Sequence, residues 1–260
     1  MYPFITILGR QYPTYAILGL MGLFLAAFIG SRRAKRYGFT AQDAIFMLAF
    51  AGGGIILGGI LLYAITQIPY MWRDRAFLFT DFSGFLTRYF TGMVFYGGLF
   101  GALIGLRVYA RFMRAPLGRV MALAVPVFPL AHAIMRIGCF SAGCCHGIAY
   151  PPPLGIPFSQ AIGATPNGIP FLPVQLYEAF INLLIFLGLW LYTKKERPWL
   201  NILLLYGSSY AFARFWLEFL RGDEARGFVF LFSTSQFISV LILLSCLCTV
   251  IWRRHLRLRT

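Results

Sequence analysis

The chain has 260 residues, of which 59% are hydrophobic and only 12% are charged. An ordinary soluble domain is about a quarter charged, so this composition is that of a membrane protein and excludes an ordinary soluble domain. The net charge of +15 does not indicate nucleic-acid binding either, because the basic residues follow apolar segments at regular places along the chain.

Seven apolar segments predict seven transmembrane helices, since a helix needs roughly 17–25 mostly apolar residues to cross the bilayer core. In chain order they cover approximately residues 14–31, 43–66, 92–110, 120–137, 174–193, 199–220 and 231–252. Met1 is followed by no basic region, so we expect no cleavable signal peptide. The predicted fold is therefore an all-α polytopic membrane protein with one membrane domain over residues 1–260.

Basic residues follow every second predicted span. They are Arg32, Arg33, Lys35 and Arg36 after the first, Arg107, Arg111, Arg114 and Arg119 after the third, Lys194, Lys195 and Arg197 after the fifth, and Arg253, Arg254, Arg257 and Arg259 after the seventh. Cytoplasmic loops carry such an excess of Lys and Arg, and anionic lipid in the inner leaflet reinforces it. The pattern predicts an external N-terminus and a cytoplasmic C-terminus.

Two connections on the predicted external side are long. Residues 67–91 are aromatic and sparsely charged, which favours an interfacial segment at headgroup depth. Residues 138–173 are predicted to form an external loop, and their second half is rich in proline and uncharged. That loop is too apolar for a disordered segment.

Five ionisable residues lie inside the spans or at their outer ends: Arg136, Glu178, Arg214, Glu218 and Arg221. Charges in a membrane are costly and tend to be functional. The last three are spaced i, i+4, i+7, which puts them on one helical face. Because guanidinium groups match phosphate oxygens, the set predicts a phospholipid-headgroup site facing the outer leaflet.

Each of these residues has a structural alternative. Arg214 and Glu218 could form only a salt bridge, Arg221 could reach the lipid headgroups, and Glu178 could stabilise the start of its helix. His132 precedes Arg136 by one turn and could orient it, act as a base, or be a structural histidine.

Glycines cluster in FYGGLFGALIG at residues 95–105. Gly97 and Gly98, beside Tyr96 at the outer end, could let the backbone approach a headgroup. Gly101 and Gly105 form a GxxxG pattern typical of close helix packing, and packing is also the alternative for Gly97 and Gly98.

Three of the five cysteines lie in RIGCFSAGCCHG at residues 136–147, whereas Cys246 and Cys248 are predicted to be apolar packing residues. Cys139, Cys144 and Cys145 are candidates for a disulfide, a reactive thiolate or free thiols. Zinc binding with His146 is disfavoured because three adjacent residues point in divergent directions. We expect no metal and no cofactor.

The sequence resembles the phosphatidylglycerol–prolipoprotein diacylglyceryl transferase family of bacterial inner membranes, with a cysteine-rich variant of its signature. The matching motifs are TYAILGLMG before SRRAKR, YGGLFG at 96–101, RIGCFSAGCCHG at 136–147, PVQLYE at 173–178 and RFWLEFLRGDE at 214–224. The resemblance implies an enzyme that moves diacylglyceryl from phosphatidylglycerol to a lipobox cysteine thiol of a prolipoprotein and releases glycerol phosphate. It also implies seven spans and an external N-terminus.

The resemblance assigns roles residue by residue. Arg136 and Arg214 match essential arginines, with His132 and Tyr96 as further catalytic candidates. The expected phospholipid-binding residues are Tyr15, Gly97, Gly98, Gly138, Gly147, Gln175, Tyr177, Glu178, Glu218 and Arg221. The chain departs from the family pattern at Tyr96, Cys139 and Cys144, where histidine, asparagine and glutamate are usual.

Three other functions remain open from the sequence. The chain could use the same phospholipid donor with another acceptor, such as a small thiol, an amine or a lipid. It could be a membrane thiol–disulfide protein that uses Cys139, Cys144 and Cys145. A phospholipid transporter is disfavoured, because the charges within the spans gather on one side of the membrane.

Overall fold

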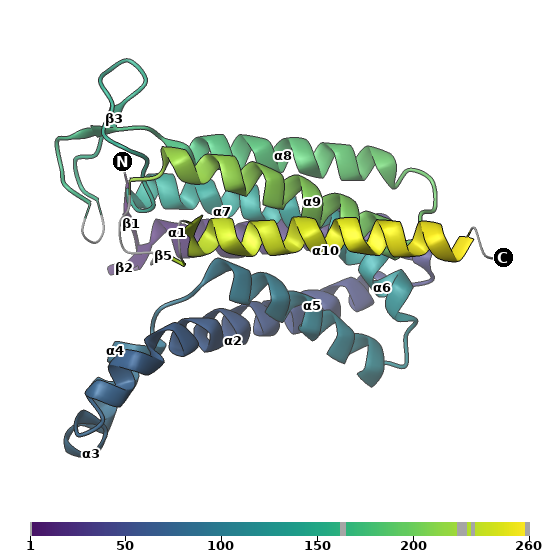
Figure 1. The fold of residues 1–260 in the computed structure, drawn as a ribbon, viewed down its shortest axis with the longest axis horizontal. Coiled ribbons are helices and arrows are strands. Elements are labelled where there is room, and N and C mark those ends of the chain that lie inside the picture. The colour runs from purple at the N-terminus through teal and green to yellow at the C-terminus, as the bar shows by residue number, and fades with distance from the viewer. Residues whose placement is uncertain (1, 162–164, 223–227, 230–231, 258–260) are drawn as a thin grey trace. The chain divides into compact units, whose positions relative to one another are not determined.

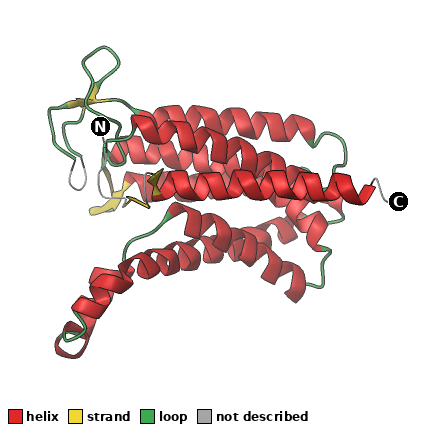
Figure 2. Ribbon diagram, viewed as in Figure 1, coloured by secondary structure: helices red, strands yellow, loops and turns green. Residues whose placement is uncertain are grey.

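The structure, a computed structural model, describes residues 2–161, 165–222, 228–229 and 232–257 (Figure 1). Helices dominate, and the short strands occur as hairpins (Figure 2). Asp223 and Glu224 of the RFWLEFLRGDE motif and Arg259 of the C-terminal basic cluster lie outside the described residues. The chain forms two compact units, Gly30–Ala124 on the one hand and Met1–Ile29 with Val125–Thr260 on the other.

The unit of residues 30–124 is built on two long helices. Its elements are η1 (Ala34–Tyr37), α2 (Ala41–Arg73), α3 (Phe77–Thr80), α4 (Phe82–Phe90), α5 (Phe95–Phe112) and α6 (Leu117–Ala124). A capping box starts α2, because the Thr40 side chain accepts from the Asp43 backbone N–H and the Asp43 carboxylate accepts from the Thr40 backbone N–H. Thus the longest helix begins at a local sequence signal.

Glycine permits the close packing of α2 on α5. A Cβ on Gly101 would collide with the Gly54 carbonyl oxygen, and one on Gly97 would collide with the Gly58 carbonyl oxygen. Backbones can approach this closely only where both helices present small residues. The GxxxG pattern therefore serves helix packing, as predicted.

The other unit begins with a hairpin and contains the remaining long helices. Its elements are β1 (Phe4–Ile7), β2 (Arg10–Pro13), α1 (Thr14–Ser31), η2 (Val125–Val127), α7 (Phe128–Ala142), β3 (Ile156–Pro157), β4 (Pro170–Phe171), α8 (Val174–Tyr192), α9 (Trp199–Leu217), η3 (Glu218–Leu220), β5 (Phe228–Val229), β6 (Phe232–Ser233) and α10 (Thr234–Arg257). Helix α8 packs between α7 and α9, and α9 packs on α10 (Figure 1). The three hairpins pair antiparallel.

The segment after α7 is tied to two distant parts of this unit. Helix α7 ends at Gly143, which adopts a left-handed φ of +74°. Antiparallel bridges then join Gly147 to Arg221 and Ala149 to Phe171. The first bridge holds the end of RIGCFSAGCCHG against the residues that follow α9, and the second joins the next residues to β4.

Each of the seven predicted segments contains a helix, but their capacity to span a membrane differs. Five helical stretches are long and apolar enough to cross one: Thr14–Ser31, Ala41–Arg73, Leu117–Ala142, Val174–Tyr192 and Thr234–Leu256. The α4–α5 pair, bent by 90°, brings the number to six if it is one span. The described chain is thus a mostly helical, polytopic membrane protein, and the count of seven stays a prediction.

Two helices extend beyond the boundaries that the sequence predicts. Helix α2 continues to Arg73, and α3 and α4 follow, so the segment 67–91 is largely helical. Helix α7 continues to Ala142, so Gly138 and Cys139 are helical rather than part of an external loop. The helical turns after 137 place Cys139 on the same helix as Arg136.

Because the backbones of α2 and α5 approach closely, an added methyl group should destabilise the protein at a glycine in their contact but not at a glycine outside it. Gly101→Ala should lower the free energy of unfolding by about 1–3 kcal/mol, because the new Cβ meets the Gly54 backbone. Denaturant titration of the purified protein in detergent measures this change.

Gly52→Ala is the matched control, since a Cβ there meets nothing within 4 Å. It should be neutral or stabilise α2 by up to about 1 kcal/mol, as alanine favours a helix over glycine. Equal effects of the two substitutions would contradict the packing interpretation.

Candidate active site

A buried carboxylate, Glu178 on α8, lies at the centre of a charged cluster. Its Oε1 is 3.0 Å from Arg136 Nη2 and accepts a 3.0 Å hydrogen bond from the Tyr210 hydroxyl. Its Oε2 is 3.7 Å from Arg221 Nη1. The Glu178 side chain is fully buried, and those of Arg136 and Arg221 are exposed by only 7% and 3%. Three segments distant in sequence therefore converge on one carboxylate.

The periodicity of α8 brings a polar face to this cluster. Gln175, Glu178 and Asn182 are all fully buried and lie at i, i+3 and i+7. Asn182 Nδ2 donates to the Glu178 backbone oxygen at 2.8 Å. Glu178 is thus a counter-charge inside the unit, and it does not cap the helix start.

His132 orients Arg136. The Arg136 Nε–H donates to His132 Nε2 at 3.2 Å, so this ring nitrogen is an acceptor and the imidazole is neutral. The 3.5 Å separation between His132 Nε2 and Glu178 is accordingly not an ion pair of a protonated histidine. Of the predicted alternatives for His132, the geometry supports the orienting role.

A second buried ion pair lies at the end of α9. Arg214 Nη2 is 2.6 Å from Glu218 Oε2, and it also donates to Ser235 Oγ at 3.2 Å. Both charged side chains are buried, with 3% and 7% exposure. The Arg214 Nη1 group has no hydrogen-bond partner among the described residues.

Arginines outnumber carboxylates in this cluster of the described residues. Three guanidinium groups (Arg136, Arg214, Arg221) lie with two carboxylates (Glu178, Glu218). Buried charges are costly unless they are paired. Together with Arg214 Nη1, which has no hydrogen-bond partner among the described residues, this composition makes the site suited to an anion.

Backbone pairing places Arg221 in the cluster. Ile148 N–H donates to the Leu220 carbonyl at 2.9 Å, next to the bridge between Gly147 and Arg221. A Cβ on Gly147 would lie 2.7 Å from the Leu220 carbonyl oxygen. Gly147 therefore serves this close approach, and Arg221 is held in the cluster rather than extended to lipid headgroups.

Gln175 joins the cluster to the turn after α7. Its Nε2 donates to the Cys144 carbonyl at 2.7 Å, while its Oε1 has no partner among the described residues. This buried acceptor can receive a hydroxyl donor from a ligand.

Other predicted residues lie apart from the charged cluster. A Cβ on Gly138 would lie 2.9 Å from Tyr15 Cα, so this glycine allows α7 to pack on α1. The Tyr15 side chain is 44% exposed, and Tyr177 packs against Leu172, Val174 and Leu217. Neither phenol makes a hydrogen bond within the described part of the chain.

Tyr96, Gly97 and Gly98 belong to the unit of residues 30–124. Tyr96 is buried at the start of α5. Gly97 and Gly98 face Gly58 and Ile55 of α2. For both glycines, the contacts support the packing interpretation.

Sequence reasoning missed three contributors to the site: Asn182, Tyr210 and Ser235. Two of them carried a readable signal, because Asn182 follows Glu178 by four residues and Tyr210 precedes Arg214 by four. Ser235, on α10, carried none, since its contact with Arg214 depends on how α9 and α10 pack.

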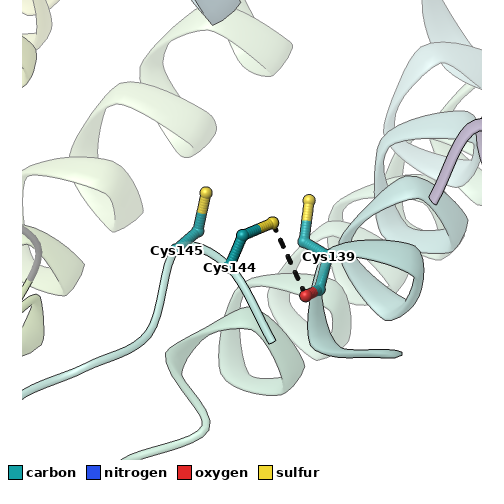
Figure 3. A group of neighbouring side chains, drawn as sticks. All are labelled: Cys139, Cys144 and Cys145. Atoms are coloured by element: carbon teal, nitrogen blue, oxygen red, sulfur yellow. Dashed lines mark hydrogen bonds between the residues drawn. The ribbon is translucent and has the colours of Figure 1, made fainter. Parts of the chain in front are cut away.

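The three cysteines of the turn gather beside this site. All five cysteines of the chain are free thiols in the structure, and Cys139, Cys144 and Cys145 have their sulfur atoms within 4.8 Å of one another (Figure 3). Hydrogen bonds from Cys139 and Cys144 lower the pKa of the Cys145 thiol, and Arg136 and Arg221 lower it further. Cys246 contacts the Leu204 carbonyl within the helices, as expected of a packing residue.

An apolar groove runs along α8 and α9. It has a volume of about 630 Å³ and is lined by Ile181, Leu184, Ile185, Ser209, Phe212, Ala213, Trp216, Leu217 and Leu220. Arg214 lies on the same helix as several lining residues, next to Ala213. The apolar lining of the groove is suited to an acyl chain.

These features define a class of protein: an α-helical membrane protein with a buried cationic site suited to an anionic lipid. The sequence model of the prolipoprotein diacylglyceryl transferase family matches residues 3–252. The chain belongs to this family.

Individual relatives agree with the family match. The chain is 32% identical to phosphatidylglycerol–prolipoprotein diacylglyceryl transferase 2 of Clostridium perfringens, over 92% of this chain and 90% of the relative. It is 35% identical to the phosphatidylglycerol–prolipoprotein diacylglyceryl transferase of Clostridium tetani, over 89% of each. Identity to the enzyme of that name from Francisella tularensis subsp. holarctica is 32%, over 83% of this chain and 78% of the relative.

The central position of Glu178 predicts a large effect of removing its charge. Glu178→Gln keeps the shape of the side chain but leaves Arg136 and Arg221 without their counter-charge. Breaking a buried pair in this way should cost about 3–5 kcal/mol of the free energy of unfolding. Denaturant titration in detergent measures the loss.

Glu196→Gln makes the same chemical change at an exposed position between α8 and α9. It should change stability by less than about 0.5 kcal/mol. A Glu178→Gln variant as stable as this control would show that the carboxylate does not neutralise the buried arginines.

Proposed function

We propose that this protein transfers the diacylglyceryl group of phosphatidylglycerol to the lipobox cysteine thiol of a prolipoprotein and releases glycerol phosphate. The observation that carries the proposal is the gathering of three buried arginines around two carboxylates, with Arg214 Nη1 lacking a hydrogen-bond partner among the described residues. The phosphodiester of phosphatidylglycerol is an anion whose oxygens guanidinium groups bind. Membership of the family supports the same activity.

Arg136, Arg214 and Arg221 are the proposed phosphate-binding groups, and Glu178 and Glu218 hold them in place. His132 accepts from Arg136 Nε while Glu178 pairs with Arg136 Nη2, so two groups hold the guanidinium. Guanidinium groups fixed by such contacts stabilise charge that develops on a leaving group.

The reaction forms one bond and breaks one. The thiolate sulfur of the acceptor bonds to the glycerol carbon of the diacylglyceryl group, and the bond from that carbon to the phosphate oxygen breaks. Glycerol phosphate leaves with the electron pair, toward the arginines. Because the cationic site favours the thiolate, it assists the nucleophile as well as the leaving group.

The remaining candidate residues are proposed to help bind the donor. The unpaired Gln175 Oε1 is suited to a hydroxyl of the glycerol headgroup, and the groove along α8 and α9 is suited to an acyl chain. Tyr15 and Tyr177 stay proposed lipid contacts. Tyr96 stays a proposed catalytic residue because it stands where the family usually has histidine.

The proposed setting is the cytoplasmic membrane of a bacterium, with seven spans, an external N-terminus and the site toward the outer leaflet. The alternating basic connections support this topology. Phosphatidylglycerol and a translocated prolipoprotein would then reach the site from the same side.

A second candidate keeps the donor chemistry and changes the acceptor. Cys139 and Cys144 stand where the family usually has asparagine and glutamate, and Gln175 donates to the Cys144 backbone carbonyl. A small thiol, an amine or another lipid would be the acceptor in this case.

A defined assay tests the transferase activity and its acceptor. Purified protein is incubated with labelled phosphatidylglycerol and a lipobox peptide, and both peptide mass and released glycerol phosphate are measured. We expect one diacylglyceryl adduct per peptide and an equal amount of glycerol phosphate. Glycerol phosphate release with other acceptors but not with the peptide would favour the second candidate, and release of neither product would contradict the donor assignment.

Variants in the same assay separate phospholipid transfer from thiol–disulfide chemistry. Arg214→Ala should lower kcat by at least about 100-fold, since it removes a group that stabilises the leaving phosphate. Cys144→Ser should lower kcat far less. Arg253→Ala, near the C-terminal end of α10, should leave kcat unchanged. The reverse order for Arg214 and Cys144 would indicate thiol chemistry.

Reporter fusions test the proposed topology. Green fluorescent protein fused after Thr260 should fluoresce, because we place the C-terminus in the cytoplasm. Alkaline phosphatase fused after residue 160 should be active, because we place that loop outside. Activity of the phosphatase fused after Thr260, with no fluorescence there, would contradict the orientation.

A further inference from the structure

The three cysteines of the turn after α7 make up a cluster whose geometry the transferase reaction does not require. Cys139 lies in the last turns of α7, and Cys144 and Cys145 follow Gly143. Their sulfur atoms lie within 4.8 Å of one another. In Figure 3 the three side chains extend to the same side of the backbone, so the sulfurs lie together rather than pointing apart.

The surrounding backbone holds this arrangement. Cys144 N–H donates to the Cys139 carbonyl at 3.2 Å, which folds the turn back onto the helix. Cys145 adopts a φ of +62°, which residues with a Cβ rarely take. The 2.7 Å hydrogen bond from Gln175 to the Cys144 carbonyl fastens the turn to α8. The positions of the sulfurs are therefore determined by tertiary contacts.

His146 does not share the site with the thiols. Its ring lies 4.1 Å from the Phe171 ring, and its Nδ1 is 2.8 Å from the Gly147 carbonyl oxygen. Among the described residues, the group of mutually close metal-ligating side chains contains the three cysteines and no fourth member. The sequence predicts that the side chains of residues 144–146 point in different directions. This is true of His146, whereas the side chains of Cys144 and Cys145 point to the same side.

Three thiolate ligands restrict which metal ions this cluster can bind. Three thiolates around one ion at a metal–sulfur distance of about 2.3 Å lie about 4 Å apart, which agrees with sulfurs within 4.8 Å of one another. Zinc in structural sites takes four ligands in a tetrahedron, and the fourth is missing among the described residues. Soft thiolate ligands favour Cu(I), which accepts three.

We propose that Cys139, Cys144 and Cys145 form a three-coordinate thiolate site for a soft monovalent cation, Cu(I). Binding forms three copper–sulfur bonds and releases the thiol protons to solvent, without a change of oxidation state. The resulting complex carries two negative charges, and the Arg136 and Arg221 guanidinium groups lie near enough to the Cys145 sulfur to interact with it electrostatically. The site does not depend on the proposed transferase activity.

The experiment uses the reduced, purified full-length protein in detergent under anaerobic conditions. Cu(I) is supplied as its complex with a chromogenic chelator, and the loss of chelator colour measures transfer to the protein. We expect one Cu(I) per chain, accompanied by an ultraviolet sulfur-to-copper charge-transfer band. Cu(I) should be held more tightly than Zn(II), which would need water as its fourth ligand.

Three single variants, Cys139→Ser, Cys144→Ser and Cys145→Ser, should each weaken Cu(I) binding by more than about tenfold, because each removes a ligand. Cys246→Ser combined with Cys248→Ser is the matched control and should bind as wild type does. Thermal unfolding of each variant shows whether it is folded.

Several outcomes would overturn the proposal. One is failure of the reduced wild-type protein to withdraw Cu(I) from the chelator. Another is undiminished binding by folded single variants of the turn. A third is a count of three rather than five free thiols in the denatured protein as isolated, because two of the three cysteines would then be joined in a disulfide. Transferase activity plays no part in these measurements, so the two proposals fail separately.

Discussion

The carboxylate of Glu178 is the contact on which the functional half of the molecule depends. It lies fully buried between Arg136 of α7 and Arg221, which follows η3, and it also accepts from Tyr210 of α9. Each of these groups would be costly to remove from water alone. Because one carboxylate contacts all of them, the charged site forms only where α7, α8 and α9 pack together.

The same balance leaves the site ready for a ligand. Glu218 pairs with Arg214, and two arginines share Glu178, so arginines outnumber carboxylates among the described residues. Within the same part of the chain, Arg214 Nη1 and Gln175 Oε1 have no hydrogen-bond partner and offer a donor and an acceptor. A phosphodiester with a glycerol hydroxyl supplies the complementary charge and hydrogen-bonding groups.

The turn after α7 links this site to the thiols. Gly147 pairs with Arg221, and Cys144 accepts from Gln175, so one short segment positions both an arginine of the site and two of the three sulfurs. A change in the thiols, whether by binding or by oxidation, would reach the phosphate site through these two hydrogen-bonded connections. Cys139 and Cys144, at which this chain departs from the family pattern, lie at the end of α7 and in this turn.

The sequence by itself determined the helical segments, the alternation of basic connections and the charged residues that matter, because hydrophobic length and helical spacing are local properties. It also placed Arg214 and Glu218 as a pair on one face. Tertiary structure alone decided that Glu178 neutralises Arg136 and Arg221 instead of capping α8, that Gly97, Gly98 and Gly138 serve packing, and that three sulfurs meet while His146 turns away. Periodicity identifies the face that a residue occupies, but the partner of that face depends on how helices distant in sequence pack together.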